Sequence, residues 1–318
     1  MTSLVLLSLL AAEPVTLKIG SIAPRESPWG QVLRVWTKAV KEKTHGEVQL
    51  EIYWNGTQGD EPAQVGKVKT GQLDGACVTA VGLGALVNDI NALQMPGLFE
   101  DWASFDKARE VMRPGFEKAL DEKGVTLVGW GDVGLDHLMA HGKPVRGPAD
   151  VKGRTPWVWR EDPILPAVFQ AVGGVVTKQT SVPEALPELA AGNVDVFSIS
   201  ALAAEQLQLS PRLDQLNLMV VAPNIGGVVL SKDKLKALTG EQRAAVVETA
   251  KVACKALTER IRAEDAAALE RLKKRMTVVD PTPEERAAWK KVFAAARAKL
   301  KAGSFTPAVV DAIEAAAR

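Results

Sequence analysis

The first part of the chain alternates between strand-like and helix-like hydrophobic patterns. Apolar and polar side chains alternate over residues 15–24, which predicts a strand. Ser27, followed by proline, is a helix-start signal, and apolar residues then recur at helical spacing. Further strands are predicted over 46–56 and within 71–80, with a helix over 61–70 between them. This β-α-β-α-β order is typical of a largely parallel α/β sheet.

The same order returns, on a smaller scale, in the middle of the chain. Strands are predicted over 174–181 and 194–200, with a helix over 183–191 between them. The segment 216–235 reads as two more strands, and an alanine-rich pattern predicts one long helix over 239–272. Two α/β units joined by several chain crossings usually enclose a ligand cleft between them.

These patterns predict an α/β fold of two interwoven lobes. We expect the first lobe over residues 13–133, the second over 134–218, return strands over 219–238, and C-terminal helices over 239–318 that bridge both lobes. The apolar run near the start of residues 1–12 resembles the core of an export signal, although it has no basic residues before it. A buried or disordered N-terminus is the alternative for that segment.

Composition narrows the class of partner. Lys and Arg total 39 and Asp and Glu total 38, so no charge excess points to nucleic acid or to an anionic membrane. The chain has eight tryptophans and one tyrosine, and tryptophan suits both cores and apolar binding clefts. Cys77 and Cys254 have no metal-like spacing with the three histidines. We interpret both cysteines as small buried hydrophobes, and a disulfide between them stays open.

Motifs of catalysis are missing from the sequence. It contains no G-x-G-x-x-G, phosphate loop, HExxH or G-x-S-x-G motif. Asp132 and Asp136 lie close together, but we interpret them as solvated loop positions, and the pair His137 and His141 falls in a predicted strand and loop. A binding protein without cofactor, metal site or enzymatic activity is therefore favoured over an enzyme.

The order of several short motifs resembles one family. The relevant stretches are KTHGEVQLEIYWNGTQGDE (43–61), VKTGQLDGACV (68–78), ALQMPGLFEDWASFDKA (92–108), KPVRGPADVKG (143–153) and PELAAGNVDVFSIS (187–200). Together they resemble the periplasmic substrate-binding proteins of tripartite ATP-independent (TRAP) transporters over nearly the whole chain. The resemblance implies two lobes that close on a small-molecule ligand in the periplasm, a long helix lying across both, and delivery to membrane permease subunits. It implies no catalysis and no metal.

The chain departs from the family at the positions that usually clamp a carboxylate. The family's arginine in the segment DVKGRTPWVW (150–159) is replaced by Trp157, while Arg154 lies earlier, in a predicted turn. Asp136 stands at the place of a second arginine, and Ile199 at the place of a common asparagine. Tryptophan offers one N–H donor and a large apolar face but no bidentate clamp, and an aspartate would repel a carboxylate.

We therefore predict a hydrophobic or lipid-like ligand instead of the family's usual organic acid. The candidate ligand-binding residues are Trp157, Trp159, Asp136, Phe169, Phe197 and Ile199. Trp157 and Trp159 are two apart on a predicted strand, so they share one face. Two alternatives remain open. In the first, Trp157 packs in a core and another arginine, such as Arg25 or Arg160, binds an organic acid. In the second, the chain is a periplasmic lipid-trafficking module that acts with an accessory periplasmic protein.

Overall fold

The structure, a computed structural model, describes residues 13–317. The expected export signal, residues 1–12, lies outside the described residues. The strands are β1 (Val15–Ser21), β2 (Val48–Tyr53), β3 (Gly75–Thr79), β4 (Val125–Ala140), β5 (Trp157–Trp159), β6 (Lys178–Thr180), β7 (Val196–Ser200), β8 (Gln215–Ser231) and β9 (Thr277–Val279). The main sheet has the order β2-β1-β3-β8-β4-β7, with β9 beside β8, and β5 and β6 form a small parallel sheet.

The main sheet is mixed, so the expected largely parallel sheet is correct only for part of it. Strand β1 runs parallel to β2 and β3, but β3–β8, β8–β4 and β4–β7 are antiparallel pairs. The antiparallel part arises because the chain crosses between the lobes and returns. The parallel pairing predicted for the first β-α-β pattern is therefore confirmed. In the second pattern it is not, because β6 pairs with β5 while β7 joins the main sheet beside β4.

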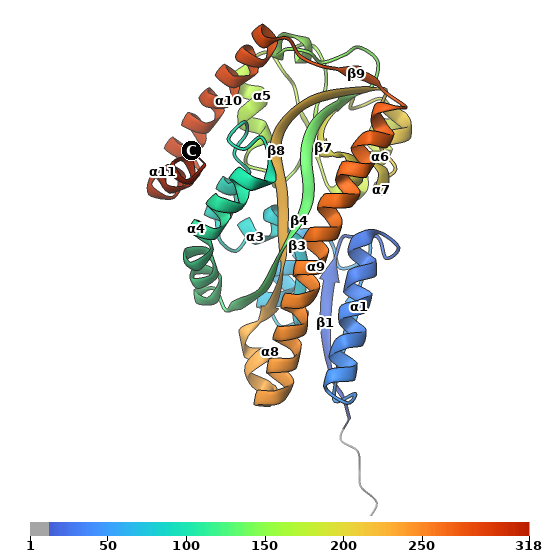
Figure 1. Ribbon diagram of the computed structural model, residues 1–318, viewed down its shortest axis with the longest axis vertical. Helices are drawn as coiled ribbons and strands as arrows, with labels where there is room; N and C mark the ends of the chain where they lie inside the picture. The colour runs from blue at the N-terminus through green and yellow to red at the C-terminus, as the bar shows by residue number, and fades with distance from the viewer. Residues whose placement is uncertain (1–12, 318) are drawn as a thin grey trace, which may run out of the picture.

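Two long strands connect the lobes. Strands β4 and β8 have 16 and 17 residues and pair along most of their length (Figure 1). The sequence patterns divided the segment of β8 into two shorter strands, and that prediction was wrong. The ladder bends at irregularities such as that between Asp132 and Gly134 instead of breaking. At Gly134 a Cβ atom would come within 2.4 Å of the Cβ of Ser200, so only glycine fits there.

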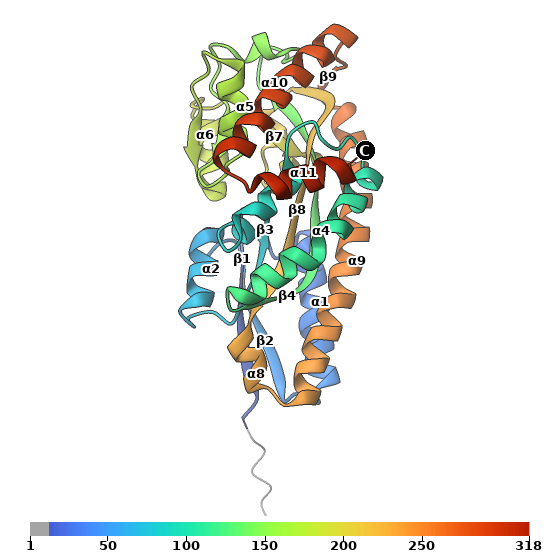
Figure 2. The same ribbon diagram turned by 90° about the vertical axis from the view of Figure 1, so that its left-hand side faces the viewer.

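The helices cover the sheet and fill both lobes. The α-helices are α1 (Pro28–Lys43), α2 (Glu61–Lys69), α3 (Ala80–Gly84), α4 (Trp102–Glu122), α5 (Leu165–Val172), α6 (Val182–Ala190), α7 (Ala201–Gln206), α8 (Lys232–Ala237), α9 (Gly240–Lys273), α10 (Pro283–Gly303) and α11 (Pro307–Ala316). Short 3₁₀ helices are η1 (Asn88–Gln94), η2 (Pro148–Val151) and η3 (Ser210–Arg212). In Figure 2, α10 and α11 lie on the side of the molecule that carries α5 and α4, against which they pack.

The predicted long helix is confirmed and spans both lobes. Helix α9 begins at a capping box in which Thr239 accepts from the backbone of Gln242. It runs along β4 and beside α1 (Figure 1), where Arg260 donates to the Gln31 side chain. Near its other end, Arg271 pairs with Glu205 of α7 at 2.6 Å. One straight helix thus contacts elements at both ends of the two long strands.

A buried ionic network fixes α9 to β4. Asp132 is fully buried on β4 and accepts from Arg109 at 2.6 Å and from Arg262 of α9 at 2.7 Å. Both arginines also bind Asp106 of α4, each at 2.7 Å. The interpretation of Asp132 as a solvated loop residue was therefore wrong, because its charge is balanced by arginines 23 and 130 positions away in the sequence.

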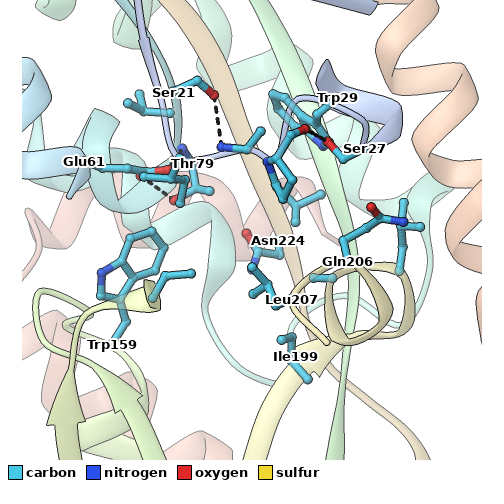
Figure 3. Close-up of a pocket in the computed structure, with 18 of the residues that line it drawn as sticks. Ser21, Ser27, Trp29, Glu61, Thr79, Trp159, Ile199, Gln206, Leu207 and Asn224 are labelled. Atoms are coloured by element: carbon cyan, nitrogen blue, oxygen red, sulfur yellow. Dashed lines mark hydrogen bonds between the residues drawn. The ribbon is translucent and has the colours of Figure 1, made fainter. Parts of the chain in front are cut away.

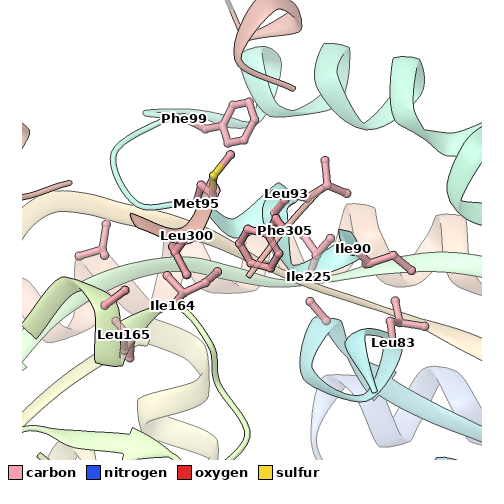
Figure 4. Close-up of a cluster of buried hydrophobic side chains, with 14 of the residues drawn as sticks. Leu83, Ile90, Leu93, Met95, Phe99, Ile164, Leu165, Ile225, Leu300 and Phe305 are labelled. Atoms are coloured by element: carbon pink, nitrogen blue, oxygen red, sulfur yellow. The ribbon is translucent and has the colours of Figure 1, made fainter. Parts of the chain in front are cut away.

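The largest hydrophobic cluster extends through both lobes and includes Val158 of β5 and Val196 of β7. It brings together residues from the 90–99 segment, α5, β8 and α10, with Phe99, Ile225 and Leu300 among its members (Figure 4). Cys77 and Cys254 are free and buried in a separate cluster, as predicted for small hydrophobes. None of the helices within residues 13–317 combines the length and apolar composition needed to cross a membrane.

Candidate functional site

A cleft lies between the end of the β1–β3 region and the lobe that carries β5, β6 and β7 (Figure 3). The atom-free space of the cleft, together with the solvent at its mouth, is about 920 Å³. Its apolar lining includes Ile22, Trp29, Val78, Val133, Trp157, Trp159, Val182, Ile199, Leu202 and Leu207. Its polar lining comprises Ser21, Ser27, Glu61, Thr79, Ser198, Gln206 and Asn224. Both lobes contribute to this wall, and the strands that connect them supply Val133 and Asn224.

Trp157 borders the cleft while being held firmly from behind. Its indole N–H donates to the Thr180 hydroxyl at 2.8 Å, and its ring stacks on Phe197 with centroids 5.6 Å apart. The residue is 6% exposed. A satisfied indole N–H leaves the ring to face the cleft as an apolar surface, so packing and a place in the cleft wall are compatible at this position.

Trp159 also borders the cleft, and its N–H reaches the other lobe. The indole donates to Asp60 Oδ2 at 2.8 Å, across the cleft. Asp60 is the N-cap of α2, where its other oxygen accepts from the Glu61 backbone at 2.9 Å. The two tryptophans of β5 therefore lie in one wall, as their spacing predicted, but they bind different partners.

The remaining predicted site residues are not all brought together. Ile199 borders the cleft, and Phe197 lies directly behind Trp157. Phe169, on α5, packs in the large cluster of Figure 4 and is not part of the cleft wall. Asp136 is not among the lining residues, although it lies close to the side chain of Asn224, which is.

Asp136 lies on β4 and is only partly exposed, so its interpretation as a solvated loop residue was wrong. Its Oδ1 atom is buried and has no hydrogen-bond partner within residues 13–317. Burial, and then the nearby carboxyl group of Asp265, raise the pKa of Asp136 well above its usual range. Asp162 adds to the same effect.

No lysine, arginine or histidine side chain lies among the described residues that line the cleft. Arg154 binds Asp195 at 2.8 Å and the carbonyl groups of His141 and Lys143, as expected for a turn residue. Arg25 and Arg160 have side chains that are 62% and 58% exposed, and they pair with neighbouring glutamates at the surface. Neither arginine borders the cleft in this structure.

Glu61 is a polar lining residue that the sequence analysis did not identify. It is fully buried at the start of α2. Its carboxyl accepts from the Thr79 backbone and hydroxyl and from the Gly82 backbone, at 2.8–3.0 Å. Burial raises the pKa of Glu61 to about 8, against the opposing effect of these hydrogen bonds. The one signal in the sequence was its position in the GDE stretch, directly after the residue that caps α2.

The arrangement suits binding and offers no metal centre. Within residues 13–317, no group of three or more His, Cys, Asp or Glu side chains is placed to hold a metal ion. A concave, mostly apolar wall with a few convergent polar groups is the usual form of a small-molecule site.

Family comparison agrees with this geometry. Residues 19–302 match the model of the bacterial extracellular solute-binding proteins, family 7. An uncharacterised protein of Sinorhizobium fredii, y4mM, is 33% identical over 187 residues, which cover 57% of this chain and 33% of that protein. A solute-binding protein of Chromohalobacter salexigens is 30% identical over 161 residues, 49% of this chain. The chain spans a third and about half of the length of these two relatives.

Solved structures share the fold. A TRAP periplasmic solute-binding protein from Ralstonia eutropha, with (S)-2-acetolactate bound, has a TM-score of 0.88 at 22% identity, covering 95% of this chain and 98% of that one. A second, from Sulfurospirillum deleyianum with succinate bound, has a TM-score of 0.87 at 20% identity, covering 95% and 99%. The family match, the two-lobed fold and the interlobe cleft lead to one conclusion: the chain belongs to the bacterial extracellular solute-binding proteins of family 7, and it shares the fold of TRAP periplasmic solute-binding proteins.

Proposed function

We propose that this chain captures a small organic molecule in its interlobe cleft and delivers it to the membrane permease subunits of a TRAP transporter. The observation that carries this proposal is a cleft walled by both lobes, at the point where β4 and β8 cross between them. We further propose that the lobes are residues 13–133 and 134–218, with 219–238 returning to the first lobe. Movement of one lobe against the other about these crossings would open and close the cleft.

An organic acid is the ligand class that the comparisons favour. The similar structures from R. eutropha and S. deleyianum hold (S)-2-acetolactate and succinate. In this chain the two alternative arginines are exposed and lie outside the cleft wall. An acid would therefore be held by neutral donors such as hydroxyl and amide groups, which form weaker hydrogen bonds to a carboxylate than arginine does.

A ligand with a mainly hydrophobic body is the second candidate. The rings of Trp29, Trp157 and Trp159 border the cleft, and Ile199 occupies the place of the family's polar residue. We propose Trp157, Trp159 and Ile199 as contacts of such a ligand, with Phe197 supporting Trp157 from behind. The comparisons give no support for an accessory periplasmic protein.

Identification of the bound molecule tests both candidates. Native mass spectrometry of the purified protein, followed by extraction, would reveal a small molecule that copurifies. Thermal shift assays with succinate, D-glucuronate, octanoate and 1-octanol then separate the classes. A ligand at 100 times its dissociation constant stabilises the folded state by about 2.7 kcal/mol, a readily measured rise in Tm. If no molecule copurifies and no compound of either class raises the Tm, the proposed receptor function is wrong.

A further inference from the structure

The side-chain amide of Asn224 lies in the centre of the cleft (Figure 3). We propose that Asn224 is the residue that binds the polar group of the ligand, a carboxyl or hydroxyl group, while the apolar body of the ligand lies against the tryptophans. This inference rests on the proposed function, because it assigns a role within the same cleft. It names a specificity-determining residue at a position different from the three where the chain departs from its family.

Most other polar side chains of the wall are already engaged within the protein. The Ser27 hydroxyl donates to the Pro24 carbonyl and accepts from the Gly30 backbone. Thr79 and Glu61 bind each other, and the Ser21 hydroxyl accepts from the Ala23 backbone. Ser27, Thr79 and Glu61 therefore have little capacity left for a ligand, and Ser21 keeps its O–H donor.

Three polar side chains of the wall remain. They are the hydroxyl of Ser198, which is buried and has no hydrogen-bond partner within residues 13–317, and the amides of Asn224 and Gln206. Figure 3 shows Asn224 in the middle of the cleft, between Trp159 and Trp29, whereas Gln206 lies to one side on the last turn of α7. An amide carries two N–H donors and a carbonyl acceptor, so after one internal bond it still has groups to offer to a ligand. Asn224 therefore combines the central position with unused hydrogen-bonding capacity.

The strand ladder holds the backbone of Asn224 in place. It lies on β8 opposite Gly134 of β4, where the chain crosses between the lobes. Its side chain lies close to Asp136, which in turn lies near Asp265 and Asp162. Because the charged groups acting on Asp136 are themselves carboxyls, the Asn224 amide is a neighbouring side chain that is able to donate to it. An amide on a backbone fixed by two neighbouring strands is pre-organised for a ligand.

A neutral amide in an apolar wall favours one kind of ligand. It can donate to a carboxyl oxygen, or both donate to and accept from a hydroxyl group, without requiring a charge on the ligand. The expected ligand thus has a single compact polar group attached to an apolar skeleton. A solute with charges at both ends would leave at least one of them without a cation in this wall.

Isothermal titration with matched probes tests the inference. Octanoate and 1-octanol share an alkyl chain and differ in their polar group, and succinate and D-glucuronate serve as strongly polar comparisons. Asn224→Leu keeps the number and branching of the side-chain heavy atoms but removes the amide. Each probe that wild type binds should then bind about five- to tenfold more weakly, the effect of one or two lost hydrogen bonds. Asn224→Ser, a smaller polar residue, should give a smaller loss and provides a second variant should the leucine variant not fold.

Asn193→Leu is the matched control, since it makes the same change at an exposed amide outside the cleft wall and should change affinity less than twofold. Gln206→Leu removes the other amide of the wall and is measured for comparison. If wild type binds a probe and Asn224→Leu binds it within twofold, the assignment of Asn224 is wrong while the receptor function stands. The same holds if Gln206→Leu shows the larger loss. If wild type binds none of the four probes, the proposed function fails together with this inference.

Discussion

Trp159 donates its indole N–H to the carboxylate of Asp60 at 2.8 Å, and this bond joins the two lobes across the cleft. Trp159 lies on β5 and Asp60 caps α2, so the bond exists only when the lobes are close together. Formation of this bond therefore depends on how far apart the two lobes are.

Removing this donor should therefore shift the lobes towards an open arrangement. Trp159→Phe keeps an aromatic ring and loses the N–H, which should lower the ratio of closed to open molecules by about two- to tenfold, the value of one hydrogen bond. Pulsed electron resonance between spin labels at Lys69 and Ala190, both exposed, reports the interlobe distance. Trp289→Phe is the control, because its N–H binds the Arg146 carbonyl away from the cleft. Unchanged distance distributions in Trp159→Phe would contradict the role of this bond.

Trp157 should tolerate a cation poorly, although arginine is the family's usual residue there. Trp157→Arg loses the stacking on Phe197 and brings a charge beside Thr180, which cannot neutralise it. We expect the free energy of unfolding to fall by about 2–4 kcal/mol, measured by urea denaturation. Val176→Arg, at a position that is 76% exposed, should change it by less than about 0.5 kcal/mol. A Trp157→Arg variant as stable as wild type would show that this wall adapts to charge.

Glu61 should make the protein less stable as the pH rises. Its pKa is raised to about 8 by burial from an ordinary value of 4.5. Between these values the folded state holds a proton that the unfolded state has lost, so the free energy of unfolding decreases with increasing pH. The full effect is at most about 5 kcal/mol over this window. Glu61→Gln should remove this dependence, so its free energy of unfolding, measured by denaturation from pH 4.5 to 8, should change less with pH than that of wild type. Parallel pH profiles of the two proteins would mean that Glu61 does not titrate in this range.

His137 should make the protein less stable as the pH falls. Burial lowers the pKa of His137 to about 4 from an ordinary value of 6.5. Between pH 4 and 6.5 the unfolded state binds the proton and the folded state does not, so stability is lost as the pH falls through this range. The loss amounts to about 3 kcal/mol. His137→Gln should lose less stability on acidification than wild type does, while His141→Gln, whose side chain is 64% exposed, should follow wild type. Equal acid losses in all three proteins would refute the assignment.

Local patterns in the sequence determined the helices, most strands and the family. The Ser27–Pro28 start of α1 and the Thr239 cap of α9 are short-range signals, and both helices begin where the sequence predicted. The spacing of Trp157 and Trp159 placed both rings in one wall, since side chains two apart on a strand share a face. The sequence also placed Arg154 in a turn, and in the structure it binds the carbonyl groups of His141 and Lys143.

The tertiary structure alone decided which side chains meet at the cleft. Phe169 is as hydrophobic as Phe197, yet α5 directs it into a different cluster. Asp132 lies in the core because two arginines from distant helices neutralise it, and Asp136 lies close to Asn224, 88 positions further along the chain, because β4 and β8 pair in antiparallel register. Hydrophobic periodicity reports how each segment is oriented towards a core, but it carries no information on which distant segment completes a hydrogen bond or balances a charge. That depends on strand register and helix packing, which are set by the whole chain folding at once.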